Sequence, residues 1–342
     1  AKIPAIYVEK DYWVTYVLFT IFNNEVGKDT VFKGGTALSK CYQMIERFSE
    51  DIDLVVLRKE GETDSKLKSK LKIVSTVVDT VLPEVTIEGI THKMGMNRKT
   101  AHSYKKEFKG DYGQVRDVII LESTWLGYYE PYTTRNIISF VGQMMLDNHQ
   151  ISIAEENGLL PFGLLVLEPI RTICEKIMSL VRFSYGENPI DDLKKKIRHT
   201  YDLYQLLTQE EFLKFFQSTA FDEMLLKVAN DDVISFRNNN QWLVHHPSEA
   251  LIFKDLDNVW IELKTTYNED FKNLQTLINQ QVMLNRKEFE NAIMLGDIEK
   301  VKEYSQKILM DTDYLSSTYR RVVPHIKTMH FLCKEGLFNH NV

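Results

Sequence analysis

Residues Val31–Val56, VFKGGTALSKCYQMIERFSEDIDLVV, carry most of the chemistry that this sequence offers. Their apolar start predicts a short strand, and Gly34 with Gly35 then predicts a turn where the backbone can approach a ligand closely. Thr36 is expected to be the N-cap of a helix over Ala37–Glu46, whose free N–H groups would face an anion held above the glycines. The stretch therefore indicates a phosphate-binding loop between a strand and a helix.

Asp51 and Asp53 lie on a second predicted strand, Asp51–Leu57. Because side chains alternate along a strand, both carboxylates share one face and stand roughly 6 to 7 Å apart. A hard cation such as Mg²⁺ or Mn²⁺ takes oxygen ligands and is usually held by one or two carboxylates together with substrate phosphates. The pair predicts a metal site that serves a nucleoside triphosphate.

Each of these motifs also has a structural alternative. Two glycines after a strand commonly form a tight turn, and an Asp-x-Asp pair commonly forms the solvated face of an edge strand. The GGTALSK segment is not a Walker loop, because the spacing of that motif is absent. The combination of strand, glycine pair, helix and adjacent carboxylates favours the functional interpretation over the structural one.

The composition is that of an ordinary globular protein, with 44% hydrophobic and 26% charged residues in 342, a length that suggests two domains. No apolar run approaches the roughly 18 residues that span a bilayer and no signal peptide opens the sequence, so we expect a cytoplasmic protein without a membrane partner. Cys41, Cys174 and Cys333 are expected to be reduced thiols in apolar helices. A net charge of −6 means that any nucleic-acid contact must come from a local patch.

The first predicted helix covers Val8–Asn24, where aromatic and apolar residues recur at helical spacing. Glu9, Lys10 and Asp11 lead into it. They are either groups of a functional site or ordinary solvated residues of a first helical turn, and the second case is the more common.

Shorter elements follow the central stretch. Glu60–Ser69 predicts a charged loop, a helix is expected from about residue 70 to residue 81, and Val85–Ile90 predicts a strand. A hairpin is expected in which Ala101–Phe108 pairs with Val115–Ser123.

Glu122 is a polar residue within the otherwise apolar returning strand of that hairpin. It is a candidate third metal ligand beside Asp51 and Asp53. The equally weighted alternative is a carboxylate that pairs with a cross-strand lysine.

The sequence beyond Pro161 becomes mainly helical, so we place a domain boundary there, with one domain over residues 1–160 and a second over residues 161–342. A helix is expected to begin at Pro169, with Lys176 on its polar face. For Arg198 and Asp202 the ordinary interpretation is an i,i+4 ion pair on a second helix, worth about 0.2–0.5 kcal/mol.

Five segments together resemble the AbiEii-like nucleotidyltransferase toxins, a family that includes the MenT proteins. The segments are EKDYWVTYVL at Glu9–Leu18, FKGGTALSK at Phe32–Lys40, RFSEDIDL at Arg47–Leu54, EKIMSLVR at Glu175–Arg182 and RHTYDLYQLL at Arg198–Leu207. The resemblance implies an α+β fold, in which a polymerase-β-like nucleotidyltransferase domain with a mixed sheet and flanking helices is followed by an all-helical bundle domain.

The resemblance also implies roles for individual residues. Asp51 and Asp53 match the metal-binding pair, Lys176 matches the lysine placed at the triphosphate, and Asp202 matches the acidic residue of the last motif. All four are candidate catalytic residues, and the helical domain would contribute the last two. The nucleotide-binding candidates are Lys33, Gly34, Gly35, Thr36, Ser49 and Lys176.

The most basic stretch of the chain, His92–Lys109, is the candidate RNA contact. Lysines could bind phosphates there while an aromatic ring stacks on an unpaired base. The alternative is a solvated hairpin that contacts only the enzyme's own triphosphate. Because some members of the family transfer nucleotides to the 3′ end of tRNA, the resemblance favours RNA, with contacts from Arg98, Lys99, Tyr104, Lys105 and Lys106.

The function predicted from the sequence is Mg²⁺-dependent transfer of a nucleoside monophosphate from a triphosphate to an acceptor hydroxyl. The resemblance implies tRNA as the acceptor, a toxin of a toxin–antitoxin pair as the biological role, and a cognate antitoxin as a partner. Two alternatives stay open: the same chemistry on a small molecule or a protein, and a catalytically idle interaction module with the same fold.

Overall fold

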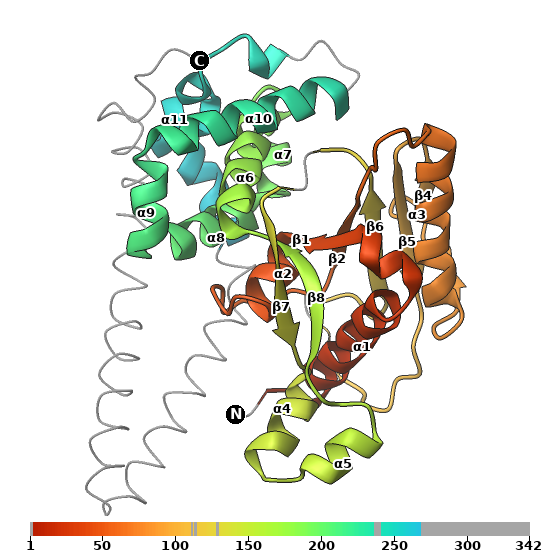
Figure 1. Cartoon of the computed structure of the whole chain (residues 1–342). Helices are drawn as coiled ribbons and strands as arrows, with labels where there is room; N and C mark the ends of the chain where they lie inside the picture. Colours follow the sequence, from red (N-terminus) through yellow and green to blue (C-terminus); the bar gives the residue numbers. More distant parts are fainter. Residues whose placement is uncertain (1–2, 111, 113–114, 128–129, 236–240, 268–342) are drawn as a thin grey trace, which may run out of the picture. The chain divides into compact units, whose positions relative to one another are not determined.

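The computed structural model describes residues 3–110, 112, 115–127, 130–235 and 241–267 (Figure 1). The chain divides into two compact units, which we describe separately. One contains Ala5–Ser179 and Tyr201–Val244, and the other contains Leu180–Thr200 and, among the described residues, 3–4 and 245–267. The domain boundary expected after residue 160 remains a prediction.

The described residues of the first unit form an eight-stranded mixed sheet in the order β3-β5-β6-β2-β1-β8-β7, with β4 paired to β5. Its strands are β1 Thr30–Lys33, β2 Ile52–Val56, β3 Glu84–Val85, β4 His92–Met94, β5 Asn97–His102, β6 Ile119–Thr124, β7 Tyr132–Ile137 and β8 Phe162–Leu167. The central strands β1 and β2 are antiparallel, whereas β2 runs parallel to β6 and β1 parallel to β8. A mixed sheet with flanking helices agrees with the expected α+β class. The sheet and its helices do not establish the separate helical bundle domain, which stays a prediction.

Helices flank the sheet and continue the chain beyond it. They are α1 Ala5–Phe22, α2 Gly34–Lys40, α3 Asp64–Asp79, α4 Phe140–Asp147, α5 Ile151–Glu156, α6 Pro169–Phe183, α7 Pro189–Lys194, α8 Ile197–Leu207, α9 Glu210–Phe216, α10 Thr219–Ser235 and α11 Leu251–Lys254. Among the described residues, no helix combines the length and the apolar character that crossing a membrane requires.

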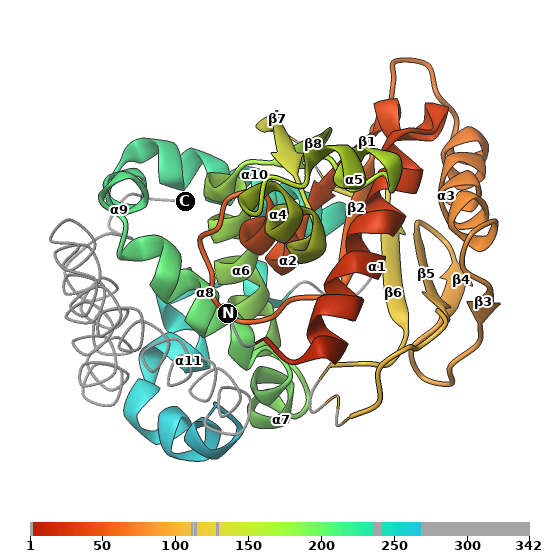
Figure 2. The same ribbon diagram turned by 90° about the horizontal axis from the view of Figure 1, so that it is seen from below.

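The core of the first unit lies between the sheet and the paired helices α1 and α3 (Figure 2). Apolar side chains of α1, α3 and the inner strands are buried together: Val14, Leu18, Ile21, Leu67, Val74, Val78, Ile52, Leu54, Ile119 and Leu121. Because each buried aliphatic side chain contributes about 1.5–3 kcal/mol, this cluster fixes the central strands and the loops at their ends.

The other unit has its own packing. Leu193, Ile197, Ile252 and Phe253 are buried in it. The Ser184 hydroxyl donates to the Leu180 carbonyl at 2.9 Å and accepts from the Ile252 N–H at 3.3 Å, which ties the end of α6 to the start of α11.

Several element predictions are wrong in detail. The helix after the glycines ends at Lys40 instead of Glu46, and α3 begins at Asp64, inside the expected loop Glu60–Ser69, because Thr63 caps it by accepting from the Lys66 N–H. The strand expected over Val85–Ile90 is confined to Glu84–Val85, since a hydrogen-bonded turn starts at Ile87.

The hairpin and the start of the helical region also differ. Strands β5 and β6 pair as expected, but the pairing stops at His102 and Ile119. Residues 162–167, expected in a mainly helical region, form β8, the strand next to the edge of the sheet, where the run FGLLVL lies between β1 and the edge strand β7.

Cys41 and Cys174 are free thiols, half-buried and buried respectively. Burial raises the pKa of Cys41 to about 12 and also raises the pKa of Cys174. Both thiols are free, as expected, but only Cys174 lies within a helix, since Cys41 is the C-cap of α2. Cys333 lies outside the described residues.

Candidate active site

The glycine loop meets the carboxylate strand where β1 ends. Lys33 lies opposite Asp53 in the antiparallel register, and Gly34 follows with a φ of 81°, a conformation that favours glycine. A Cβ atom at Gly34 would lie 2.3 Å from Oδ2 of Asp53. The Asp53 carboxylate therefore packs directly against the backbone of the loop, and only glycine leaves room for it.

The second glycine is equally crowded. A Cβ at Gly35 would lie 2.4 Å from Nη2 of Arg47 and 3.0 Å from the Ser49 hydroxyl. Thr36 is not the N-cap: α2 already starts at Gly34, and the Thr36 hydroxyl donates to the Asp51 carbonyl at 2.6 Å and lies 2.9 Å from the Ser49 hydroxyl. These bonds bind the glycine loop to the segment that leads into β2.

Three carboxylates gather at this end of the sheet. Asp53 on β2 pairs in register with Glu122 on the parallel strand β6, and Asp51 immediately precedes β2. Loss of solvent, followed by the negative charges of Glu122 and Asp51, raises the pKa of Asp53 to about 7. A bound cation would stabilise the ionised form of Asp53, because its positive charge would offset the repulsion among the carboxylates.

Glu122 takes the cross-strand pairing role that the sequence left open, and its role as a third metal ligand stays a prediction. Its carboxylate accepts from Lys99 at 2.9 Å, as the cross-strand alternative requires, and from the Asn97 amide at 2.8 Å. Although burial acts in the opposite direction, Lys99 and Asn97 lower the pKa of Glu122. The register nevertheless places this residue beside Asp53.

The donor set around Asp51 and Asp53 consists of oxygen atoms, which suits Mg²⁺ or Mn²⁺. Within the described part of the chain, no group of three or more His, Cys, Asp or Glu side chains is arranged to hold a metal ion. Two carboxylates together with the oxygen atoms of a bound triphosphate are the set that fits.

Lys176 and Asp202 come together as the resemblance implies, and Arg47 joins them. Asp202 on α8 accepts from Nε and Nη2 of Arg47, both at 2.7 Å, and lies 2.8 Å from Nζ of Lys176 on α6. Burial alone would raise the pKa of Asp202, but Lys176 and Arg47 hold it well below the usual range. Asp202 therefore belongs to a buried cluster with two cations, Lys176 and Arg47.

A second ionic chain begins at the glycine loop. Lys33 lies 3.1 Å from the Glu175 carboxylate, and Arg171 lies 3.2 Å from the other oxygen of Glu175. Arg171 also pairs with Asp231 on α10. Since Glu175 and Lys176 are neighbours on α6, this helix holds both Lys33 and Asp202.

Sequence reasoning gave no role to Arg47, Arg116 and Glu175. Arg47 lies inside a quoted motif, so its place between the glycine loop and the carboxylate strand was an available signal. Glu175 is likewise the first residue of a quoted motif, whereas Arg116 was only a charge within the expected hairpin. The interpretation of Glu9, Lys10 and Asp11 as solvated is wrong: all three are buried, because α1 starts at Ala5 and carries them in its second turn.

The RNA-contact candidates separate into groups. Arg98 donates to the Ser75 hydroxyl at 2.6 Å, and Lys99 belongs to the carboxylate cluster. Tyr104 is unsuited to stack on a base, because its ring is buried against Trp13 at a centroid distance of 5.8 Å. Lys105, which is 84% exposed, and the partly exposed Lys106 lie on the segment that joins β5 to β6.

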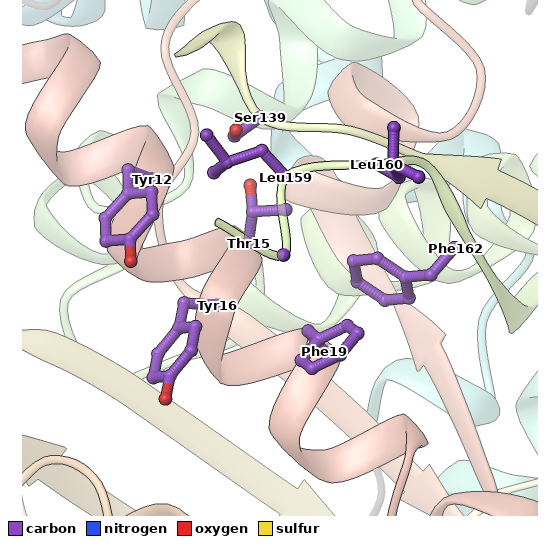
Figure 3. A pocket seen from close by; sticks show the side chains of 9 residues that line it. Tyr12, Thr15, Tyr16, Phe19, Ser139, Leu159, Leu160 and Phe162 are labelled. Carbon is purple, nitrogen blue, oxygen red and sulfur yellow. The ribbon is translucent and has the colours of Figure 1, made fainter. Parts of the chain in front are cut away.

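A small pocket elsewhere in the unit lies among Tyr12, Tyr16 and Phe19 of α1 and Phe162 of β8 (Figure 3). Its volume of about 20 Å³ is enough for roughly one water molecule. It contains none of the expected site residues, and we assign it no ligand.

A glycine loop against a carboxylate, adjacent acidic residues on neighbouring strands and a buried lysine define a candidate nucleoside-triphosphate site. The family model described as nucleotidyl transferase AbiEii toxin, type IV TA system, matches residues 16–291. The chain therefore belongs to the AbiEii nucleotidyl transferase toxin family, as the sequence motifs indicated. Comparisons with curated proteins and with solved structures give no match.

Proposed function

We propose that this protein is a metal-dependent nucleotidyltransferase that transfers a nucleoside monophosphate from a triphosphate to the 3′ hydroxyl of an RNA, with tRNA as the first candidate. The observation that carries the proposal is the contact between Gly34 and Asp53, beside Glu122 and Asp51. It joins a backbone loop that can approach phosphates to the carboxylates that can hold their counterion.

Mg²⁺ or Mn²⁺ would supply charge neutralisation at the triphosphate and at the developing negative charge. The acceptor oxygen bonds to the α-phosphorus as the bond from this atom to its bridging oxygen breaks. Pyrophosphate leaves with the electron pair, and the hydroxyl proton passes to a carboxylate of the site. The protein contributes mainly position and electrostatics, since this chemistry needs little covalent help from side chains.

The residues divide these tasks. Asp51 and Asp53 would hold the metal, and the loop Lys33–Thr36 with Ser49 would bind phosphate oxygens. Lys176 offsets charge on the leaving pyrophosphate, while Asp202 orients Lys176 through the 2.8 Å contact between them. Glu122, the third carboxylate, would become a further metal ligand if its hydrogen bond with Lys99 were broken.

The family supports the biological role of a toxin that an antitoxin counteracts. The resemblance to relatives that modify tRNA, together with the exposed Lys105 and Lys106, supports RNA as the acceptor. We place the reaction in the cytoplasm, where both substrates are abundant.

The test is a transfer assay with each of the four α-labelled triphosphates and Mg²⁺, using total RNA, total protein and no acceptor in parallel. Label in RNA, above all in the tRNA band, is the expected result. Label only in protein or in a small product would show that the acceptor is a protein or a small molecule instead of RNA. Absence of label under every condition would support the catalytically idle interaction module.

Replacing Lys176 with Ala is expected to lower kcat/KM for the triphosphate by roughly 100-fold, as for the loss of one charge-stabilising donor. Arg182→Ala is the matched control, because Arg182 lies on the same helix but packs on Phe183 at 5.3 Å. Its loss should be much smaller. Equal small losses in both variants would return Lys176 to a purely structural role.

A further inference from the structure

The buried charges at the start of α1 hold the segment that connects β5 to β6. The Glu9 carboxylate accepts from the backbone N–H of Glu107 at 2.7 Å. Lys10 donates to the Arg116 carbonyl at 2.8 Å and also to the Val118 carbonyl. Two neighbouring residues of one helix therefore fix both ends of this segment.

Arg116 is held on both sides of its backbone. While Lys10 binds its carbonyl, its N–H donates to Oε1 of Glu50 at 2.8 Å. Lys10 and Glu50 are themselves an ion pair at 3.1 Å, with side chains 0% and 7% exposed. Burying such a pair costs free energy unless its hydrogen bonds are satisfied, so the core here is organised to hold the backbone of Arg116.

The fixed backbone carries the Arg116 side chain to the metal-site carboxylate. Its Nη1 lies 3.2 Å from Oδ1 and 3.4 Å from Oδ2 of Asp51. The guanidinium-bearing side chain is still 45% exposed. A phosphate from solution can therefore reach Arg116 beside Asp51.

The segment that connects β5 to β6 lines a pocket of about 410 Å³. We call it the Arg116 pocket. Ile87, Ile90 and Val115 supply apolar surface, Tyr112 an aromatic ring, and Arg116 and Asp117 charges. The volume lies within the range of roughly 300–1,000 Å³ that is usual for ligand sites. Apolar walls with an aromatic ring and a few charges suit a nucleobase and its phosphate.

Charged side chains on this segment lie next to the pocket and form ion pairs. Lys106 pairs with Asp117, and its ammonium lies 5.9 Å from the centre of the Tyr112 ring. Lys106 thereby neutralises Asp117, and Lys105 pairs with Glu107 at 2.6 Å. The half-exposed Arg116 is therefore the cation at the pocket that can meet an RNA phosphate.

We infer that the Arg116 pocket is the acceptor subsite, which takes the 3′-terminal nucleotide of a single-stranded RNA end. The inference rests on the proposed function and adds a place for the second substrate. The hydroxyl that attacks must lie close to the carboxylates. Arg116 contacts the Asp51 carboxylate and also lines a pocket that is large enough for the nucleotide that carries this hydroxyl. In the subsite, Arg116 binds the phosphate of that nucleotide, and the base lies among Ile87, Tyr112 and Val115.

The test compares Arg116→Ala, Arg116→Lys and Val115→Trp with wild type, using tRNA and each triphosphate as separate ligands. Arg58→Ala is the matched control, because Arg58 is 47% exposed and pairs with Asp64 at 2.8 Å away from the pocket. Thermal unfolding confirms that each variant is folded.

Arg116→Ala should raise the KM and the Kd for tRNA about ten-fold, as for the loss of a hydrogen bond to a charged group. The slope of binding against salt should fall by about one. Arg116→Lys should restore part of the affinity, and Val115→Trp should weaken tRNA binding by filling the pocket. The triphosphate KM should stay constant in Val115→Trp and in Arg58→Ala, which do not change a partner of Asp51.

The two proposals fail in different ways. Transfer to tRNA that Arg116→Ala and Val115→Trp leave unchanged, or an equal loss for triphosphate and tRNA in Val115→Trp, would overturn the acceptor subsite while nucleotidyl transfer stands. A wild-type protein that transfers no nucleotide, yet binds tRNA in a way that depends on Arg116, would overturn the proposed reaction and support the subsite.

Discussion

Asp53→Asn is expected to abolish metal-dependent nucleotide transfer, with a loss of at least about 100- to 1,000-fold, while the protein stays folded. The substitution removes the charge that faces the glycine loop, Glu122 and Asp51, and an amide is a poor ligand for Mg²⁺. Asp51→Asn should have the same consequence. The measurement is single-turnover transfer with labelled triphosphate across a range of Mg²⁺ concentrations.

Asp147→Asn is the control for this pair, since Asp147 is exposed on α4 and only accepts from the Gln143 amide. It should keep wild-type turnover. If Asp51→Asn or Asp53→Asn did the same at unchanged thermal stability, the metal assignment would be wrong.

The stability of Asp53→Asn should also differ from wild type in a pH-dependent way. The pKa of Asp53 is about 7 in the folded protein and about 3.9 when unfolded. Between these values the folded state binds more protons, so the free energy of unfolding of wild type falls as the pH rises. Asn does not titrate.

Without metal, the melting temperature of Asp53→Asn relative to wild type should therefore increase from about pH 4 to about pH 7 and remain level above. Thermal unfolding at a series of pH values measures this difference. A difference that is constant over the whole range would contradict the repulsion among the carboxylates.

Asp202→Asn should destabilise the protein by about 3–5 kcal/mol, because it leaves Arg47 and Lys176 with no carboxylate between them. The side chain of Asp202 is fully buried, and those of Arg47 and Lys176 are 10% and 7% exposed, so water cannot replace the lost charge. Chemical denaturation at neutral pH provides the free energy of unfolding.

The matched control is Asp64→Asn, which breaks the exposed pair with Arg58 and should cost less than about 1 kcal/mol. Because the pKa of Asp202 is lowered, its contribution is present above the ordinary aspartate pKa and is lost as the pH falls through and below about 4. Equal small losses in both variants would show that the buried cluster does not stabilise the fold.

The parts of the site that are local in sequence were predictable. The strand before Gly34 and the strand that carries Asp53 are confirmed, since their apolar runs are short and bounded by polar and glycine residues. Alternation along the strand also predicted that Asp51 and Asp53 share one face. The cap at Thr36 was missed because the hydroxyl is used by the Asp51 carbonyl, a tertiary partner.

Contacts between distant residues were not predictable from pattern. Arg47 and Asp202 are 155 positions apart, and neither periodicity nor charge spacing connects them. Asp202 and Lys176 were predicted as site residues only from the family resemblance. Lys10 was assigned to solvent because its partners, Glu50 and two backbone carbonyls, belong to other segments.

Strand β8 shows a different limit. Its six residues FGLLVL form a short apolar run, which suits a buried strand or part of a buried helix equally well. Pairing with β1 and β7 decides the outcome, and neither neighbour is adjacent in sequence.

Binding of Mn²⁺ in the presence of a non-hydrolysable triphosphate, followed by electron paramagnetic resonance, tests the central claim most directly. It needs no knowledge of the acceptor. Wild type should bind Mn²⁺ together with the triphosphate, and the folded double variant Asp51→Asn with Asp53→Asn should lose this binding, because the two carboxylates beside the glycine loop are the protein's share of the metal ligands. Equal Mn²⁺ affinity in the two proteins would contradict the account.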